Sequence, residues 1–126
     1  MKHQTSWALC LTLLATSWAH ALTVAPYSAE TLHKLQAAGE PVALHFHADW
    51  CPTCRAQDKA LEVLKADPAL NIAVLTVDYD KESALKKQLK VLGQSTFVIY
   101  RGQVEKKRQI GETSTDGIRT ALRAAL

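Results

Sequence analysis

The sequence predicts an α/β fold in which a central mixed β-sheet carries helices on both faces. From residue 22 onward, short apolar runs typical of strands alternate with segments of helical periodicity. Two runs, Val42–His47 and Ile72–Val77, are separated by one helical segment and therefore predict a parallel βαβ unit. Two later runs flank Arg101-Gly102 and predict an antiparallel hairpin. A sheet with both kinds of pairing is a mixed sheet.

The composition describes an ordinary globular domain. The chain has 126 residues, which is enough for one domain with a single core. Its residues are 48% hydrophobic and 21% charged, as in typical folded proteins. A formal net charge of +3 is too small to indicate nucleic-acid binding, so no nucleic-acid partner is expected.

Residues 1–21 differ from the rest and predict a secretory signal peptide cut before Leu22. They combine a basic start with an apolar stretch and the small-x-small site Ala19-His20-Ala21. The alternative is an uncleaved membrane anchor, for which the apolar stretch is short. Cleavage removes Cys10 and leaves a domain over 22–126 that we expect not to span a membrane.

The first part of this domain is expected to contain two strands and a helix. Leu22–Pro26 predicts a short first strand. Ser28 is a suitable N-cap for a helix that Gly39 ends. Val42–His47 is a short apolar run, typical of a buried central strand. The expected inward side chains of the helix are Leu32 and Leu35.

A second helix is expected from Pro52 to about Ala66, with Asp67-Pro68 closing it because a residue before proline resists the helical conformation. Ile72–Val77 follows as a strand parallel to Val42–His47. The apolar face of this helix is predicted to consist of Ala56, Ala60, Leu61 and Leu64.

The last part of the chain predicts a helix, a hairpin and a final helix. Lys81–Lys90 is helical, and Thr96–Tyr100 pairs with Gln103–Gln109. The charges of Glu105-Lys106-Lys107-Arg108 favour an edge strand protected from aggregation over a docking patch. Gly111 ends the hairpin. The expected inward residues are Leu85, Leu89 and Leu92 in the first helix and Ile118, Leu122 and Ala125 in the last, which Thr113 and Asp116 are expected to cap.

The chemistry is concentrated where the central strand meets the second helix, in Trp50-Cys51-Pro52-Thr53-Cys54. The N-terminus of a helix is electropositive and stabilises a thiolate, which lowers the cysteine pKa. We expect Cys51 to be the exposed attacking thiolate and Cys54 to resolve the mixed disulfide. The alternatives are half of a zinc site or an inert pair, but the second ligand pair of a structural zinc site is missing.

Trp-Cys-x-x-Cys between a strand and a helix resembles the active site of the thioredoxin superfamily. Gly93-Gln94-Ser95-Thr96-Phe97-Val98-Ile99-Tyr100 is similar to the second landmark of that family. Phe46-His47-Ala48-Asp49-Trp50-Cys51 is similar to the C-terminal thioredoxin-like domain of the transmembrane periplasmic disulfide reductase. The Pro52-Thr53 dipeptide is shared with reductases of cytochrome c maturation.

The resemblance implies the thioredoxin fold and a periplasmic thiol–disulfide oxidoreductase that reduces protein disulfides. It implies no cofactor and no resident metal, and it implies a membrane electron-donor protein as partner. The site residues that it implies are Cys51, Cys54, His45 and Trp50 for catalysis, and Pro52, Thr53, Gln94, Ser95 and Thr96 for substrate binding.

This chain departs from the family at a buried position near the cysteines. His45 stands where the family has a buried acid, and Val74 is expected where the family has a lysine on the adjacent strand. A neutral imidazole accepts a proton, so His45 is a candidate acceptor for the proton of Cys54. The alternative is a core histidine with one backbone partner. His47 is expected on the same sheet face.

A further departure is Ser95, which stands where the family has a cis-proline. A cis bond before a residue other than proline costs about 2.5–4 kcal/mol, so Gln94–Ser95 is predicted to be trans. The missing proline opens a second hypothesis, in which Cys51, Cys54 and a histidine bind or deliver a metal ion. Two more hypotheses are a disulfide-forming oxidant or isomerase, and a docking protein whose redox site is vestigial.

Overall fold

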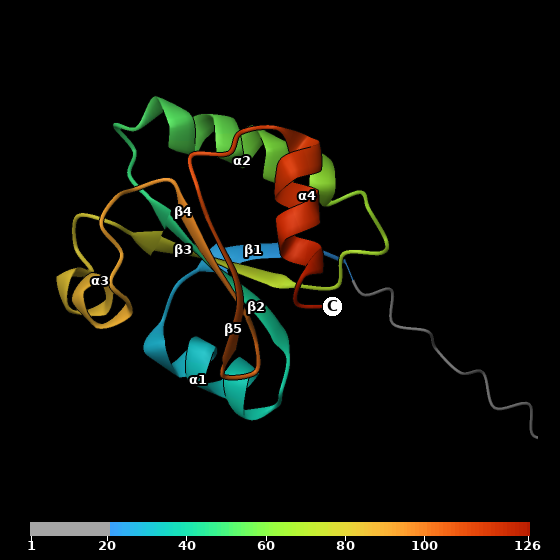
Figure 1. The fold of residues 1–126 in the computed structure, drawn as a ribbon, viewed down its shortest axis with the longest axis horizontal. Coiled ribbons are helices and arrows are strands. Elements are labelled where there is room, and N and C mark those ends of the chain that lie inside the picture. Colours follow the sequence, from blue (N-terminus) through green and yellow to red (C-terminus); the bar gives the residue numbers. More distant parts are fainter. Residues whose placement is uncertain (1–20) are drawn as a thin grey trace, which may run out of the picture.

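The computed structural model describes residues 21–126, which form one five-stranded sheet with helices on both faces (Figure 1). Residues 1–20 of the predicted leader lie outside the described residues. The strands are β1 (Thr23–Pro26), β2 (Pro41–His47), β3 (Ala73–Asp78), β4 (Thr96–Arg101) and β5 (Val104–Ile110). The helices are α1 (Ala29–Ala37), α2 (Pro52–Leu64), α3 (Ser83–Leu89) and α4 (Thr115–Arg123).

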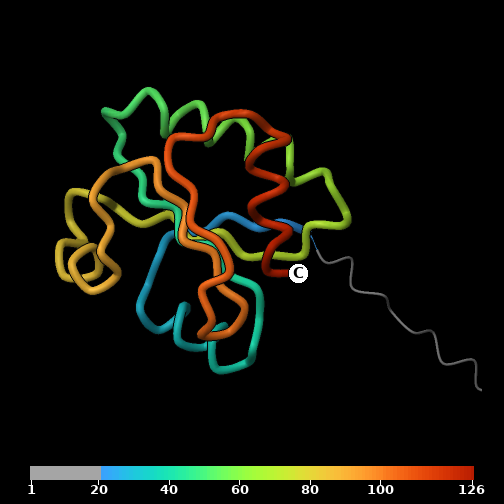
Figure 2. Tube along the Cα trace, in the orientation of Figure 1, coloured from blue at the N-terminus to red at the C-terminus, as the bar shows by residue number. Residues whose placement is uncertain are grey.

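The sheet is mixed, as the sequence predicts. Its strand order is β1-β3-β2-β4-β5, with parallel pairing of β3 to both β1 and β2. β4 runs antiparallel to β2, and β5 antiparallel to β4. The chain path in Figure 2 shows the β4–β5 hairpin crossing the middle of the molecule. β2 is central in the sheet, and all but its last residue are buried. Because the strand is fixed in this way, the start of α2 that follows its carboxyl end is held in place.

The helices form two layers, with α2 and α4 over one sheet face and α1 and α3 over the other (Figure 1). In β2 the side chains alternate between these faces, as the pleat of a strand requires. Ala43 belongs to the apolar cluster under α2 and α4, and its neighbours Val42 and Leu44 belong to the opposite cluster. By this alternation His45 and His47 face α2.

The predicted start of α2 is confirmed. Cys51 is its N-cap and Pro52 its first residue, and the N–H of Cys54 donates to Cys51 Sγ at 3.1 Å. Proline is favoured at the first helical position because its missing N–H has no partner there in any case. The sequence therefore places the two cysteines in the first turn of a helix.

Two details near other helix ends correct the sequence analysis. Leu92 is 95% exposed rather than part of the core, because α3 ends at Leu89 and Lys90 adopts a left-handed φ of 56°. The helical spacing that predicted a buried Leu92 does not extend past that point. The N-cap of α4 is Ser114, not Thr113, and its hydroxyl accepts the N–H of Gly117 at 3.0 Å.

The sheet register corrects a third expectation. The neighbour of His45 on β3 is Thr76, whereas Val74 lies beside Ala43. The residue beside His45 therefore lies two positions further along β3 than expected. A polar but uncharged threonine therefore stands beside His45.

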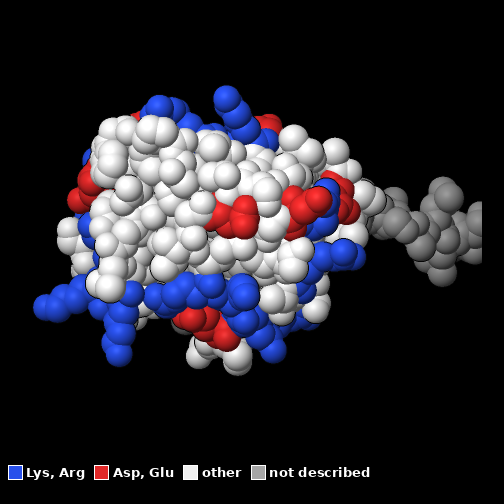
Figure 3. All heavy atoms as spheres, turned by 45° about the horizontal axis from the view of Figure 1, so that its top comes forward, with Lys and Arg blue, Asp and Glu red and all other residues white. Residues whose placement is uncertain are grey.

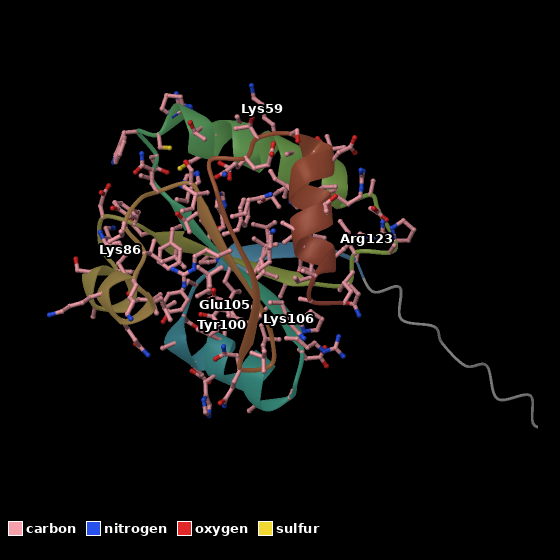
Figure 4. All side chains as sticks on the ribbon, in the orientation of Figure 1. Lys59, Lys86, Tyr100, Glu105, Lys106 and Arg123 are labelled. Atoms are coloured by element: carbon pink, nitrogen blue, oxygen red, sulfur yellow. The ribbon has the colours of Figure 1, made fainter. Side chains whose placement is uncertain are left out.

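The charged strand lies at the edge of the sheet, as predicted. β5 is the last strand, and Figure 4 labels Glu105 and Lys106 on it. Figure 3 shows basic side chains gathered in a band along one border of a broad surface that carries few charges. No helix in the described part of the chain is long and apolar enough to cross a membrane.

Candidate active site

Both cysteines are buried at the start of α2. Both are free thiols, so the structure shows the dithiol state. Cys51 is 2% exposed and Cys54 is fully buried. The expectation of an exposed Cys51 is therefore wrong, because Cys51 lies within hydrogen-bonding distance of the buried Ser95 side chain.

The hydroxyl of Ser95 lies between the two sulfurs. Its Oγ is 3.2 Å from Cys51 Sγ and 3.1 Å from Cys54 Sγ. The Gln94–Ser95 bond is trans, as predicted, since no peptide bond in the described residues is cis. Ser95 has a φ of 60°, a left-handed conformation that costs an ordinary residue roughly 1–2 kcal/mol. Proline is held at a φ of about −65° and does not adopt this conformation.

Three hydrogen bonds to the backbone of Ser95, one of them from a side chain, hold it in this conformation. Its N–H donates to the carbonyl of Phe46 at 2.8 Å. Its own carbonyl accepts from the side chain of Gln57 and from the N–H of Gly111, both at 3.0 Å. These bonds tie the Ser95 loop to β2, to α2 and to the end of β5, so the position of the hydroxyl is set before any substrate arrives.

The two cysteines have opposite pKa shifts. Burial works against ionisation of Cys51, but hydrogen bonds from the Cys54 thiol and the Ser95 hydroxyl, together with the N–H of Cys54, outweigh it and lower its pKa. Burial and the neighbouring Cys51 raise the pKa of Cys54. Since a thiolate is the nucleophile, this asymmetry agrees with the expected roles of Cys51 in attack and Cys54 in resolution, which stay predictions.

Gln57 is a site residue that the sequence analysis missed. It is fully buried in α2, and its Oε1 lies 2.8 Å from His45 Nε2. Its Nε2 donates to the carbonyls of Ser95 and Glu112, each at 3.0 Å. The available signal was its position in the helical repeat with Ala60 and Leu61, which are buried. The predicted face instead used Ala56, which is only partly buried.

His45 is fully buried and lies on the expected sheet face, where its ring stacks on Phe97 with centroids 4.3 Å apart. Because Gln57 Oε1 can only accept, His45 Nε2 carries the proton and Nδ1 carries the lone pair. Nδ1 has no hydrogen-bond partner in the part of the chain that the structure describes, and it lies 3.9 Å from Asp58 Oδ1. Burial lowers the pKa of His45 to about 4, so it is neutral near pH 7 and forms no ion pair there.

Within residues 21–126, no hydrogen bond joins His45 to either sulfur. Among the described residues, hydrogen bonds connect it to Cys54 only through Gln57 and Ser95. His47 points the same way as His45, with ring centroids 5.5 Å apart. Its Nε2 lies 2.8 Å from Asp58 Oδ2, so Asp58 rather than a cysteine is its partner.

The remaining predicted site residues surround the cysteines at different depths. Trp50 is 59% exposed, and its indole N–H donates to Asp80 at 2.8 Å. It borders a cleft of about 460 Å³ that extends toward β1 and β3 and that neither cysteine lines. Of the predicted substrate-binding residues, Pro52 is exposed, Thr53 and Gln94 are partly buried, and Ser95 and Thr96 are buried. In residues 21–126 no group of three or more histidine, cysteine or acidic side chains is placed to hold a metal ion.

The buried neutral state of His45 predicts a loss of stability in acid. Unfolded His45 takes up a proton near pH 6.5, whereas folded His45 does so only near pH 4. The unfolded state therefore binds more protons in this window, and the free energy of unfolding falls by about 3 kcal/mol as the pH drops from 7 to 4. Urea unfolding of the wild type and of His45→Leu across this range measures it. An equally steep fall in the variant would contradict this origin.

Comparisons with known proteins agree with this geometry. The Thioredoxin family profile matches residues 23–124. The chain is 34% identical over 80 residues to the thiol:disulfide interchange protein DsbD of Salmonella typhi, and 33% identical over 81 residues to that of Escherichia coli K12. These matches cover 59% and 60% of this chain, and the chain spans 14% of the length of either relative.

Solved structures support the same assignment of fold. Trxlp from Edwardsiella tarda EIB202 superposes with a TM-score of 0.75 and 40% identity, over 79% of this chain and 98% of that one. A mutant thioredoxin from Halobacterium salinarum NRC-1 superposes with a TM-score of 0.70 and 20% identity, over 85% of this chain and 92% of that one. The second likeness supports the fold alone.

Proposed function

The chain belongs to the thioredoxin family and carries its Cys-x-x-Cys pair, which makes it a thiol–disulfide oxidoreductase, and we propose that it is exported and reduces protein disulfides. The observation that carries the proposal is the asymmetric dithiol at the start of α2. Cys51 is the more acidic thiol there, and Cys54 beside it is fully buried and has the higher pKa, as suits a resolving thiol.

The reaction has two exchanges. The Cys51 thiolate attacks one sulfur of a substrate disulfide, which breaks the S–S bond and releases the first substrate thiolate. Cys54 then loses its proton and attacks Cys51, which forms the Cys51–Cys54 disulfide and releases the second substrate thiolate. The substrate gains two electrons and the enzyme loses two. Trp50 and Pro52 form the exposed contact surface around this exchange, and Thr53 beside them is partly buried.

The reducing direction is supported by the likeness to DsbD and by the resemblance of Pro52-Thr53 and the β2 strand to electron donors. Under this proposal a membrane electron-donor protein returns the Cys51–Cys54 disulfide to the dithiol. Residues 1–21 would direct the chain to the periplasm, and N-terminal sequencing of the exported protein tests this by whether it begins at Leu22.

The role of His45 as acceptor of the Cys54 proton stays a prediction. Two observations weigh against a direct transfer: the lone pair of His45 lies on Nδ1, away from Gln57, and its low pKa makes it a weak base near pH 7. An unchanged pH–rate profile for disulfide reduction in His45→Leu would exclude this role.

The reduction potential of the Cys51–Cys54 couple tests the direction. We expect the metal-free domain to have a potential below about −220 mV, toward the thioredoxin end of the range. The measurement equilibrates the protein with defined thiol buffers and counts free thiols by alkylation.

A potential near about −120 mV would instead support an oxidant, as in strong periplasmic disulfide donors. Absence of a reversible couple would contradict the oxidoreductase assignment altogether. Cys54→Ser is the matched control, because it keeps Cys51 but forms no internal disulfide.

A further inference from the structure

The Ser95 hydroxyl contacts two sulfurs but has only one proton to donate. A serine hydroxyl is one donor with two acceptor lone pairs. Its oxygen lies at nearly equal distances from Cys51 Sγ and Cys54 Sγ, at 3.2 and 3.1 Å. It can therefore donate to only one sulfur at a time, and the charges on the sulfurs decide which.

We propose that the Ser95 hydroxyl is a catalytic hydrogen-bond donor that serves the two sulfurs in turn, first the attacking Cys51 thiolate and then the resolving Cys54 thiolate. This inference rests on the proposed dithiol exchange but not on its direction. A proline at the same position could not donate such a hydrogen bond, since proline has no donor.

In the first exchange the hydroxyl donates to Cys51. A hydrogen bond to a charged acceptor is stronger than one to a neutral acceptor, so the O–H turns toward the thiolate. The Cys54 thiol donates its own proton to the same thiolate. Hydrogen bonding to Ser95 favours the charged form of either sulfur: it contributes to the lowered pKa of Cys51, and it acts against the burial that raises the pKa of Cys54.

Formation of the mixed disulfide moves the hydrogen bond of the Ser95 hydroxyl from Cys51 to Cys54. When Cys51 bonds to a substrate sulfur, it loses its negative charge and is no longer the stronger acceptor. The proton of Cys54 passes to the departing substrate thiolate or, where that is a weak base, to the buffer. Charge now forms on Cys54, and the hydroxyl turns to donate to it while keeping its own proton. Cys54 then attacks Cys51 and the substrate sulfur leaves as a thiolate.

Cys54 needs this donor because it is fully buried. A buried thiolate without a hydrogen bond is costly, and burial is the leading cause of its raised pKa. Among the described residues, Ser95 is the one side chain besides Cys51 that hydrogen-bonds to the Cys54 sulfur. No hydrogen bond joins His45 to Cys54 in these residues, so Ser95 is the side chain placed to assist resolution, together with the backbone of Ala48.

The fold holds Ser95 where its hydroxyl can donate to either sulfur. The bonds to Phe46, Gln57 and Gly111 restrain its backbone from both sides. Ser95 is 4% exposed, so water competes little for its hydroxyl. The left-handed backbone is kept although serine gains nothing from it locally, which is typical of strain held at functional sites.

The test uses two variants that remove the hydroxyl by different routes. Ser95→Ala keeps a side chain at the left-handed position, and Ser95→Gly removes the strain at a φ of 60°. Reaction of the reduced domain with the chromogenic disulfide DTNB releases one coloured thiolate when Cys51 attacks and a second when Cys54 resolves, so stopped-flow absorbance separates the two exchanges.

In both variants we expect the pH midpoint of the first phase to rise by about one unit and the second phase to slow by about tenfold or more, since a hydrogen bond to a charged group is lost at each step. The matched control is Ser83→Ala, which removes an exposed hydroxyl at the start of α3 and should leave both phases unchanged.

An unchanged second phase in both variants would overturn the proposal. A slower second phase in Ser95→Ala alone would also overturn it, because the slowing would then come from the strained backbone and not from the lost hydroxyl. Thermal unfolding confirms that each variant is folded. DTNB reports only the chemistry of the two cysteines. A reduction potential typical of an oxidant would thus contradict the proposed reducing direction without contradicting the role of the Ser95 hydroxyl.

Discussion

Replacing Cys51 with serine is expected to abolish disulfide reduction, with a loss on the order of 10⁴-fold or more in the rate. Cys51 is the more acidic thiol of the pair and the N-cap of α2. Serine is nearly isosteric and is a good N-cap, so the fold should be kept while the nucleophile is lost. Reduction of a disulfide-bonded protein substrate, followed by alkylation of the released thiols, measures the effect.

Cys54→Ser is the matched variant, since it removes the resolving thiol and leaves Cys51 in place. It should still attack but then stop at the mixed disulfide, which non-reducing electrophoresis detects as a covalent complex with the substrate. Reversed behaviour, with trapping in Cys51→Ser and no complex in Cys54→Ser, would exchange the two roles. Equal residual activity in both variants would refute a two-cysteine mechanism.

Gln57→Ala should reduce the free energy of unfolding by about 2–4 kcal/mol, the largest effect on stability that we expect from a polar substitution. Gln57 is fully buried and connects three elements through His45, Ser95 and Glu112. Its loss leaves the N–H of His45 without a partner in the core and releases one restraint on the Ser95 carbonyl. A buried donor that loses its acceptor bears the full cost of desolvation.

Urea unfolding of the reduced protein measures this loss. Gln88→Ala is the control: it makes the same substitution on the exposed side of α3, where the glutamine side chain has no hydrogen bond to the described residues, and should change stability by no more than about 0.5 kcal/mol. A similarly small effect at Gln57 would show that the bonds around it do not support the core.

Much of the fold follows from local patterns in the sequence. The alternation of apolar strands with helical periodicity predicts the order of elements that the sheet contains. Pro52 after a buried strand predicts the start of α2, and the charges of β5 predict an edge strand. Where local spacing was extended past a helix end, as at Leu92, the prediction failed because a left-handed residue ends the repeat.

In the candidate site, too, local features follow from the sequence and long-range contacts do not. The sequence alone determines that two cysteines share the first turn of a helix, because Cys51 and Cys54 lie in one local motif. Only the tertiary structure decides that Ser95 lies between their sulfurs, that Gln57 rather than a cysteine is the partner of His45, and that Thr76 is its neighbour. These contacts join residues far apart in the chain. They depend on strand register and on one left-handed backbone angle, for which no local periodicity exists.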